Sequence, residues 1–408
     1  QVSWDDIQKF LTRLNAQEAG NIPASWAYVL STEAQWEYAC RAGTTTAYSW
    51  GETISASDAN WNHGNDANQT ENVGSYSANP WGFFDMHGNV WEWTADAWGT
   101  YSSVAQTDPF NAGATDSRRV SRGGSWTTAG TSLRTASRIH NPTSSRFNGM
   151  GFRVGFQQVP HIVELNSTVD LEMIWVEPGT FTMGQTGVTN SEPEHNVTLT
   201  QGFYFGKYEV TQAQYEAVMA GVTGDLNATP SNWHGNPNRP VEKVSREDIQ
   251  VFLTRLNAQE AGNIPAGWAY VLPTEAQWEY ACRAGTTTAY SWGDSISASD
   301  ANWNHGADAN QTENVGQYSA NPWGFFDMHG NVWEWVSDWY AEYGSNAVTD
   351  PDGPATGTLR IRRGGSWYNG VGLMPLARRV YNSPSYRTNH IGFRLGFQQV
   401  NQAPTDLN

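Results

Sequence analysis

An acidic turn with a central glycine occurs twice in this chain. Residues 327–334 read Asp-Met-His-Gly-Asn-Val-Trp-Glu, and residues 85–92 are identical to them. Two carboxylates around a glycine turn supply hard oxygen atoms, and calcium takes about six to eight such ligands from carboxylates, amides and main-chain carbonyls. These residue types therefore favour calcium binding. The alternative is that the Asp, Asn and Gly residues only build Asx-type turns.

The turn is repeated because the chain contains one and a half copies of one domain. Residues 1–93 align without a gap with residues 243–335, and 83 of the 93 positions are identical. The copies also end alike, at 151–159 and 392–400. A period of this length indicates domain duplication and not a solenoid of short repeats.

The repeat predicts the domain boundaries. Residues 161–242 have no counterpart in the first copy, so we expect an N-terminally truncated domain at 1–159 and a complete domain at 160–400. Residues 401–408 are expected to be a linker, and they resemble the start of a cadherin-like repeat.

One segment has diverged between the copies. Residues 127–150 keep only 6 of 24 residues of the equivalent segment 368–391, although the sequence on both sides is retained. Uniform drift after one duplication does not produce such a contrast. We interpret it as a constant scaffold that carries a changeable surface, as in binding loops on a rigid fold. The alternative is a tolerant loop without a ligand.

Periodicity and capping residues predict the elements around these motifs. The spacing of apolar residues and the cap Ser245 predict a helix over 245–257. Cys40 and Cys282 occupy equivalent apolar positions, so we expect both to be free and buried. Further helices are expected at 273–285 and 211–219, and a strand, a Pro-Gly turn and a strand at 173–183.

A series of motifs resembles the formylglycine-generating enzyme, or sulfatase-modifying factor, domain family. The motifs follow the family order through almost all of 161–400, and the first copy carries the same set from Leu30 onward. The resemblance implies an α+β, C-type-lectin-like fold that is rich in loops and here duplicated in tandem. The matching segments are 177–184, 208–211, 240–241, 272–281, 330–335, 363–367 and 392–394.

The resemblance also implies two calcium sites in each copy. The first would use side-chain oxygens of the Asp and Glu of the acidic turn and the carbonyls of its Gly and Val. The second would use an Asn, the carbonyl of its neighbour and a later Asp and Asn. The implied ligands are Asp327, Gly330, Val332, Glu334, Asn302, Trp303, Asp308 and Asn310, and in the first copy Asp85, Gly88, Val90, Glu92, Asn60, Trp61, Asp66 and Asn68. His87 and His329 lie inside the turns, where we expect them to form hydrogen bonds because calcium prefers oxygen.

The catalytic residues of the family are not found at their expected positions. The family's oxidase binds copper through two cysteines five residues apart, whose soft thiolates suit Cu(I). Those positions are Asn369 and Met374 in the second copy and Thr128 and Leu133 in the first. Calcium is therefore the expected cofactor and copper is not expected.

These observations predict a non-catalytic, calcium-stabilised ligand-binding or adhesion module of a larger extracellular protein. Its variable faces would bind an unknown protein or glycan. The net charge of −17 argues against a nucleic-acid partner, and no apolar run is long enough to span a membrane. The expected location is secreted or cell-surface. The predicted ligand surface comprises Trp126, Thr128, Leu133, His140, Trp367, Tyr368, Asn369, Met374, Tyr381 and Tyr386.

Two alternatives remain open at this point. One alternative is that the chain is an oxidase that converts a substrate cysteine to formylglycine. The other is that it is a structural spacer without a ligand. The absent thiols count against the oxidase, and the divergent segment counts against the spacer.

Overall fold

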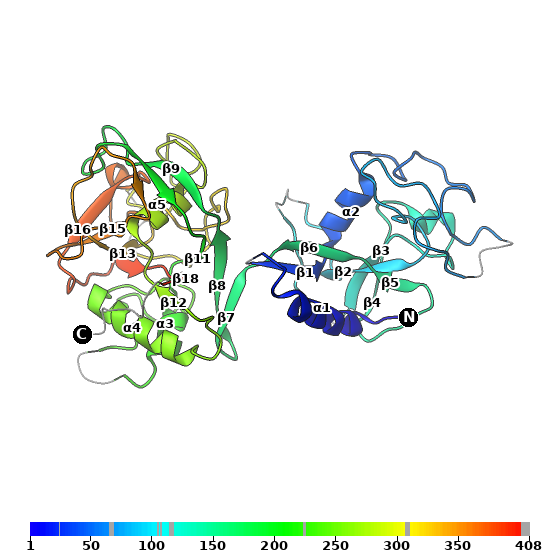
Figure 1. The fold of residues 1–408 in the computed structure, drawn as a ribbon, viewed down its shortest axis with the longest axis horizontal. Helices are drawn as coiled ribbons and strands as arrows, with labels where there is room; N and C mark the ends of the chain where they lie inside the picture. The colour runs from blue at the N-terminus through cyan, green and yellow to red at the C-terminus, as the bar shows by residue number, and fades with distance from the viewer. Residues whose placement is uncertain are drawn as a thin grey trace. The chain divides into compact units, whose positions relative to one another are not determined.

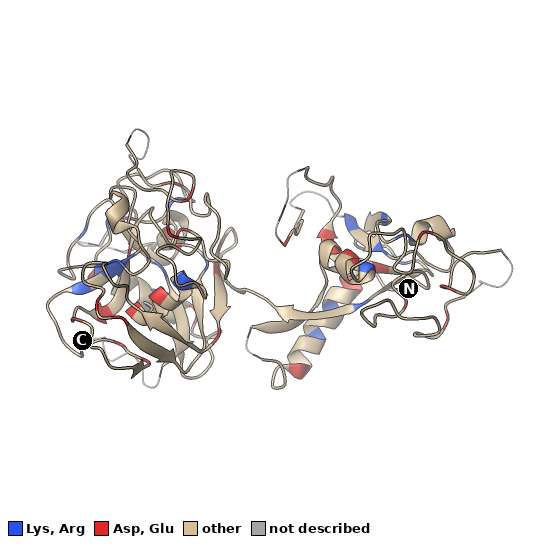
Figure 2. Ribbon diagram, turned by 90° about the horizontal axis from the view of Figure 1, so that it is seen from above, with Lys and Arg blue, Asp and Glu red and all other residues tan. Residues whose placement is uncertain are grey.

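The computed structural model describes residues 1–23, 25–64, 69–103, 106, 108–113, 118–222, 226–306 and 311–400. The chain separates into two compact units, Gln1–Val159 and Pro160–Asn408. In Figure 1 the first unit carries the blue to blue-green part of the ribbon and the second the green to red part. Lys and Arg residues are interspersed with Asp and Glu along both units (Figure 2).

The first unit combines helices with two small sheets. One sheet has the strand order β4-β3-β2-β5, and β1 pairs antiparallel with β6 in the other. Its described elements are α1 (Trp4–Glu18), β1 (Trp26–Leu30), α2 (Glu33–Arg41), β2 (Trp91–Ala97), β3 (Arg118–Arg122), the 3₁₀ turn η1 (Gly130–Leu133), β4 (Arg138–Pro142), β5 (Met150–Phe152) and β6 (Val154–Gln158).

The second unit repeats this plan and adds an N-terminal part. The sheet β16-β15-β13-β17 corresponds to the four-stranded sheet of the first unit, and the strand pair becomes a five-stranded sheet of order β12-β18-β11-β8-β7. The added part, Pro160 to Glu242, contains β7 (His161–Asn166), β8 (Val169–Val176), β9 (Gly179–Met183), β10 (His195–Leu199), β11 (Phe203–Gly206) and α3 (Gln212–Met219). The shared part contains α4 (Arg246–Gln259), β12 (Trp268–Val271), α5 (Glu275–Arg283), β13 (Trp333–Trp339), β14 (Val348–Thr349), β15 (Arg360–Arg363), η2 (Val371–Leu373), β16 (Arg379–Asn382), β17 (Ile391–Phe393) and β18 (Gly396–Gln399).

The three predicted helices are confirmed, and each begins with a capping residue. The side chains of Ser245, Thr274 and Thr211 accept the amide of the third helical residue, whose own side chain accepts the amide of the cap. Two of the four amides left free at each helix start are thereby satisfied. At the end of α5, Ala284 adopts a φ of 47°, and Gly285 follows with a φ of 86°.

The predicted strands at 173–183 are confirmed, but they belong to different sheets. β8 lies between β7 and β11, whereas β9 pairs with β10. The Pro-Gly turn therefore leads the chain from one sheet to the next. The added part of the second unit thus contributes to two sheets.

Both cysteines are free and buried, as predicted. Burial raises the pKa of the Cys40 thiol to about 12 and that of Cys282 still further. Neither side chain forms a thiolate near neutral pH, so both are core residues. In the described part of the chain, no helix has the length and apolar character needed to cross a membrane.

Candidate functional site

The acidic turn of the second unit forms a tight, buried loop ahead of β13. Asp327, Gly330 and Asn331 adopt φ angles of 55°, 90° and 54°. The Asp327 Oδ2 atom accepts the Gly316 amide at 2.6 Å. A Cβ atom at Gly330 would lie 2.3 Å from the Asn302 carbonyl oxygen, so only glycine fits there.

Glu334, at the end of the turn, is held by a buried arginine and a tryptophan. The Arg394 Nη2 atom lies 2.8 Å from Glu334 Oε1, and the Trp278 indole donates to Oε2 at 2.6 Å. All three side chains have less than 2 % exposed surface. The carboxylate is therefore charge-paired and fixed in position.

Sequence reasoning missed a third buried carboxyl group, that of Glu209. It accepts the Asn331 side-chain amide at 2.7 Å and the Val332 main-chain amide at 3.0 Å, and so supports the turn from the added N-terminal part. The available signal was its place in the motif at 208–211. A Glu beside an apolar strand is otherwise easily taken for a solvent-exposed residue.

Three buried carboxyl groups, those of Asp327, Glu334 and Glu209, share the guanidinium of Arg394. Burial raises the pKa of Asp327 to about 6, against the opposing effect of the Gly316 amide. Burial, together with the charges of Asp327 and Glu334, raises the pKa of Glu209 well above its usual range. Arg394 is the guanidinium that acts on both groups. A divalent cation bound at the turn would offset the remaining charge.

The residues of the turn fit calcium. In the described part of the chain, no three His, Cys, Asp or Glu side chains are arranged to hold a metal. The predicted site therefore depends on the carbonyl oxygens of Gly330 and Val332 in addition to Asp327 and Glu334. Such a mixture of hard oxygens is the donor set that calcium takes. Calcium binding stays a prediction from the sequence.

The first unit repeats the geometry of the turn. Asp85 Oδ2 accepts the Gly74 amide at 2.7 Å, and Asp85 has the same φ of 55° as Asp327. Glu92 is 2.8 Å from Arg153 Nη2 and accepts the Trp36 indole at 2.7 Å. The predicted main-chain ligands Gly88 and Val90 lie between them.

The second predicted calcium site is described only in part. Asn302 is buried, and its Nδ2 atom donates to the Gln311 carbonyl at 3.0 Å, while its own carbonyl accepts the Asn331 amide at 2.8 Å. Asn302 therefore joins this loop to the acidic turn. Trp303 donates its indole N–H to the Ser297 carbonyl at 3.1 Å. Asn60 and Trp61 have the same contacts in the first unit, and Asp66, Asn68, Asp308 and Asn310 lie outside the described residues.

The histidines of the two turns form hydrogen bonds, as predicted. His329 Nδ1 lies 2.9 Å from the Met374 carbonyl, and His87 Nδ1 lies 2.6 Å from the Leu133 carbonyl. Burial lowers the pKa of each imidazole to about 4. Each neutral ring fastens the acidic turn to the divergent segment.

Three of the ten residues of the predicted ligand surface are exposed, four are half-buried and three are buried. Tyr368 has 58 % of its surface exposed, and Tyr381 and Tyr386 are also exposed. In the first unit Trp126 and His140 are half-buried, and His140 packs on Trp98 with ring centroids 4.3 Å apart. Trp367 is mostly buried, with its indole donating to the Asn389 carbonyl at 3.1 Å.

Residues that both divergent segments share anchor them to the framework. Arg379 Nη2 lies 2.6 Å from Glu275 Oε2, and Arg138 Nη2 lies 2.6 Å from Glu33 Oε2. The retained Asn389 supplies the carbonyl that holds Trp367. The few conserved positions in these segments thus include the ones that fix their backbone, while exposed positions such as Tyr368 have changed.

Comparison with known proteins accounts for both units. The model of the sulfatase-modifying factor enzyme 1-like domain matches residues 1–157 and 161–398. The chain belongs to this family. Formylglycine-generating enzyme of Streptomyces coelicolor is 31% identical over 255 residues, which cover 52% of this chain and 77% of that protein. Chaperone protein LppX of Paenibacillus barcinonensis is 33% identical over 253 residues, covering 50% of this chain and 82% of that protein.

Solved structures agree on the fold. PvdO from Pseudomonas aeruginosa has a TM-score of 0.50 and 26% identity, with 59% of this chain and 100% of that chain covered. Treponema denticola variable protein 1 has a TM-score of 0.51 and 24% identity over the same shares, which shows the fold alone. The predicted sulfatase-modifying factor fold, α+β and C-type-lectin-like, is therefore confirmed.

The structure corrects three residues of the predicted ligand surface: Met374, Leu133 and Trp367, the last of which has only 7% of its surface exposed. Met374 and Leu133 have no exposed surface, so they belong to the core of each sulfatase-modifying factor domain and not to an accessible face. The reason is that η1 and η2 turn these side chains inward. Met374 packs so closely on Gly365 that a Cβ atom there would lie 2.3 Å from Met374 Cε.

The donors at the family's copper position do not fit copper. Asn369 Oδ1 accepts the Trp333 indole at 2.7 Å and the Ser366 hydroxyl at 2.6 Å. In the first unit the Thr128 hydroxyl donates to the Ser125 carbonyl at 3.0 Å. A hard amide oxygen engaged in two hydrogen bonds and one buried thioether do not replace a pair of thiolates.

Proposed function

We propose that this chain is a non-catalytic, calcium-stabilised binding or adhesion module of a secreted or cell-surface protein. The faces that contact its ligand are the exposed parts of residues 127–150 and 368–391. The ligand is a protein or a glycan, because exposed tyrosines stack on sugar rings and on peptide side chains.

The observation that carries this proposal is that each divergent segment keeps its anchoring arginine while its exposed residues differ between the two units. Arg379 and Arg138 bind the same framework carboxylate in their own units. By contrast, the exposed Tyr368, Tyr381 and Tyr386 correspond to Thr127, His140 and Ser145. The retained anchors keep two different surfaces in one geometry, as in binding loops on a rigid fold.

The site chemistry supports binding over oxidation. Neither cysteine of the chain reaches solvent, and the copper position holds no thiol. A relative that is named a chaperone, LppX, is about as similar to this chain as a formylglycine-generating enzyme is. The family therefore contains proteins with names from both functional classes, and the residues of the site decide between them.

The proposal is tested by exchanging only the exposed residues. The full chain and its Y368T/Y381H/Y386S variant are screened on glycan and peptide arrays, with W292S as a control in the invariant framework of the same unit. We expect the triple variant to lose at least about tenfold in affinity for a ligand of the second unit while its melting temperature is retained. Binding that survives the triple exchange, or no ligand for either unit, contradicts the proposal.

A second assay separates binding from catalysis. The full chain is incubated with copper, oxygen and a Cys-x-Pro-x-Arg peptide, and the mass of the peptide is followed. We expect no conversion of cysteine to aldehyde. Turnover by protein purified without contaminating oxidase would make the chain an enzyme and overturn the proposal.

A further inference from the structure

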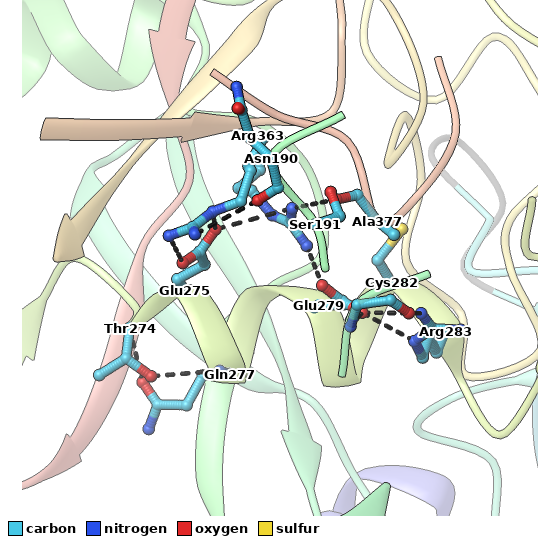
Figure 3. A network of polar contacts seen from close by, with 12 residues as sticks. Asn190, Ser191, Thr274, Glu275, Gln277, Glu279, Cys282, Arg283, Arg363 and Ala377 are labelled. Carbon is cyan, nitrogen blue, oxygen red and sulfur yellow. Dashed lines mark hydrogen bonds and ion pairs between the residues drawn. The ribbon is translucent and has the colours of Figure 1, made fainter. Parts of the chain in front are cut away.

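One buried arginine of the second unit has no acidic partner. Four other buried arginines of this unit each form an ion pair with a glutamate: Arg283, Arg363, Arg379 and Arg394. Figure 3 shows two of these pairs, which share Glu279. Arg362 of β15 is also buried, with 6% of its surface exposed, but among the described residues no carboxylate lies within ion-pair distance of it. Because a buried charge without a counter-charge destabilises the folded chain, the fold alone does not account for Arg362.

Arg362 also leaves most of its hydrogen-bonding capacity unused. Its Nη2 atom donates to the side-chain oxygen of Asn382, whereas Nε and Nη1 have no partner among the described residues. The guanidinium carbon lies 5.5 Å from the ring centroid of Trp335. Burial lowers the pKa of Arg362 to about 10, so the side chain stays charged at neutral pH. It therefore offers a positive charge and unused donors to an acceptor from outside.

Aromatic side chains of the divergent segment surround this guanidinium. The ring centroid of Tyr386 lies 5.7 Å from the guanidinium carbon, and Tyr386 has 41% of its surface exposed. Burial, together with the charge of Arg362, lowers the pKa of the nearby His390 to about 4, so this ring is neutral. Tyr368 stacks on His390 with ring centroids 5.2 Å apart and planes 11° apart. We name Arg362, Tyr368, Tyr386 and His390 the Arg362 cluster.

The whole Arg362 cluster differs between the two units. Its members correspond in the first unit to Ser121, Thr127, Ser145 and Gly149. Arg362 lies before the divergent segment, in the strand that leads to the retained Gly-Gly-Ser-Trp. Both units nevertheless form the same four-stranded sheet. The sheet therefore does not require a cation and three rings at these positions, and a ligand of the second unit is the better reason for them.

The chemistry of the cluster favours a ligand with a carboxylate on a flat ring. A guanidinium binds a carboxylate through charge-assisted hydrogen bonds. The net charge of −17 repels polyanions, so one local anionic group is favoured over a highly charged polymer. Tyr368 is 58% exposed and has His390 on one face of its ring, so the other face is suited to stack on a flat apolar surface. An acidic sugar combines such a surface with a carboxylate in one residue.

We propose that the Arg362 cluster binds the carboxylate of an acidic sugar at the end of a glycan. Tyr386 turns aside, as exposed side chains do within nanoseconds, and the carboxylate accepts the unused donors of Arg362. The sugar ring stacks on Tyr368. This inference rests on the proposed function, because it names the ligand class of the divergent face of the second unit. The first unit has Ser121 in place of the cation and therefore has a different specificity.

The test compares oligosaccharides that end in glucuronate with counterparts that end in glucose. We expect the full chain to bind the glucuronate series at least about tenfold more tightly, since hydrogen bonds to charged groups contribute that much. R362S introduces the residue of the first unit and is expected to abolish this preference while the melting temperature is retained. R362K, which keeps the charge without the planar guanidinium, is expected to keep part of the preference.

Arg378 provides the matched control. It belongs to the same divergent segment, is half-buried, and donates to the Thr189 carbonyl at 3.4 Å. R378S removes the same charge as R362S, and we expect it to keep the full preference for glucuronate. Equal losses in R378S and R362S would mean that only the net charge of the chain matters, and this result would overturn the proposal.

The remaining outcomes separate this inference from the proposed function. Equal binding of both oligosaccharide series, or a glucuronate preference that R362S retains, overturns the carboxylate site and leaves a binding module in place. Binding of acidic peptides and of no acidic glycan assigns the cluster to a protein partner and also overturns the proposal. A chain that binds neither glycans nor peptides contradicts both the inference and the proposed function.

Discussion

Arg387 binds Asp248 through two parallel hydrogen bonds, from Nε to Oδ2 at 2.6 Å and from Nη2 to Oδ1 at 2.7 Å. Arg146 and Asp6 form the same pair in the first unit, at 2.8 and 2.7 Å. Both arginines belong to the divergent segments, and both aspartates lie in the first turn of a framework helix. This ion pair therefore connects the variable segment of each domain to its constant framework.

Removing the ion pair between Arg387 and Asp248 is expected to destabilise the second unit. Asp248 also accepts the amide of the cap Ser245 at 2.8 Å, so the pair fixes the start of α4 as well. We expect R387A to lower the free energy of unfolding by about 1 kcal/mol, because the arginine is partly exposed. R387K keeps the positive charge but cannot form the two parallel hydrogen bonds of the guanidinium. We expect it to lower the free energy of unfolding by about half as much as R387A. Urea unfolding measures both, and equal stability of R387A and the parent contradicts the anchoring role.

The same pair makes stability depend on pH. Burial acts to raise the pKa of Asp248, but hydrogen bonds from Arg387 and Ser245 outweigh burial and lower it. A carboxyl group whose pKa is lower in the folded protein stabilises it above the unfolded value of about 4, and this contribution is lost as pH falls further. R387A is therefore expected to flatten the fall in melting temperature between pH 5 and pH 3.

Asp338 is expected to have the opposite pH dependence. Burial, with repulsion from Glu275, raises its pKa to about 7, although it accepts the Glu275 amide at 2.7 Å. The folded state therefore binds the proton more tightly than the unfolded chain, and stability decreases as pH rises from about 4 to 7. We expect D338N to raise the melting temperature at pH 8 and to change it little at pH 4. The exposed Asp352 gives the control D352N, which is expected to leave the melting temperature unchanged at both pH values.

The sequence predicted the parts of the fold that depend on local rules. Ser245 and Thr274 start helices because a cap and an acidic or amide residue three positions later satisfy each other. The acidic turn was recognisable because it occurs twice and combines two carboxylates with a central glycine. The family motifs then predicted the α+β, C-type-lectin-like fold, which solved structures confirm, but not the order of the strands.

The rest depends on contacts that are distant in sequence. Glu209 supports a turn more than a hundred residues away, and the only local signal for it is its place in the motif at 208–211. Met374 was expected at the surface because its neighbours in sequence are variable. Its side chain points inward because η2 turns it against Gly365, which only the folded backbone reveals.

The buried position of Met374 leads to a test of that correction. M374A removes a fully buried side chain beside Gly365, so we expect it to lower the free energy of unfolding by about 2–5 kcal/mol. The neighbouring Val371 is 51% exposed, and V371A is expected to change stability by less than about 0.5 kcal/mol. Equal effects of the two substitutions on the free energy of unfolding in urea would contradict the burial of Met374.

Calcium is expected to raise the stability of both units through the acidic turns. Asp327 is the turn carboxylate without an arginine within salt-bridge distance among the described residues, whereas Glu334 is charge-paired to Arg394. The chain is melted in excess chelator and in millimolar calcium, and we expect a higher melting temperature with calcium. D327N/D85N is expected to abolish most of this increase, because the remaining ligands carry too little charge to hold a divalent ion. D352N, which changes an exposed carboxylate far from the turns in sequence, is expected to keep the full increase. An identical melting curve in chelator and in calcium would contradict calcium binding. The turns would then be Asx-type structures that are stabilised by Gly316 and Asn302.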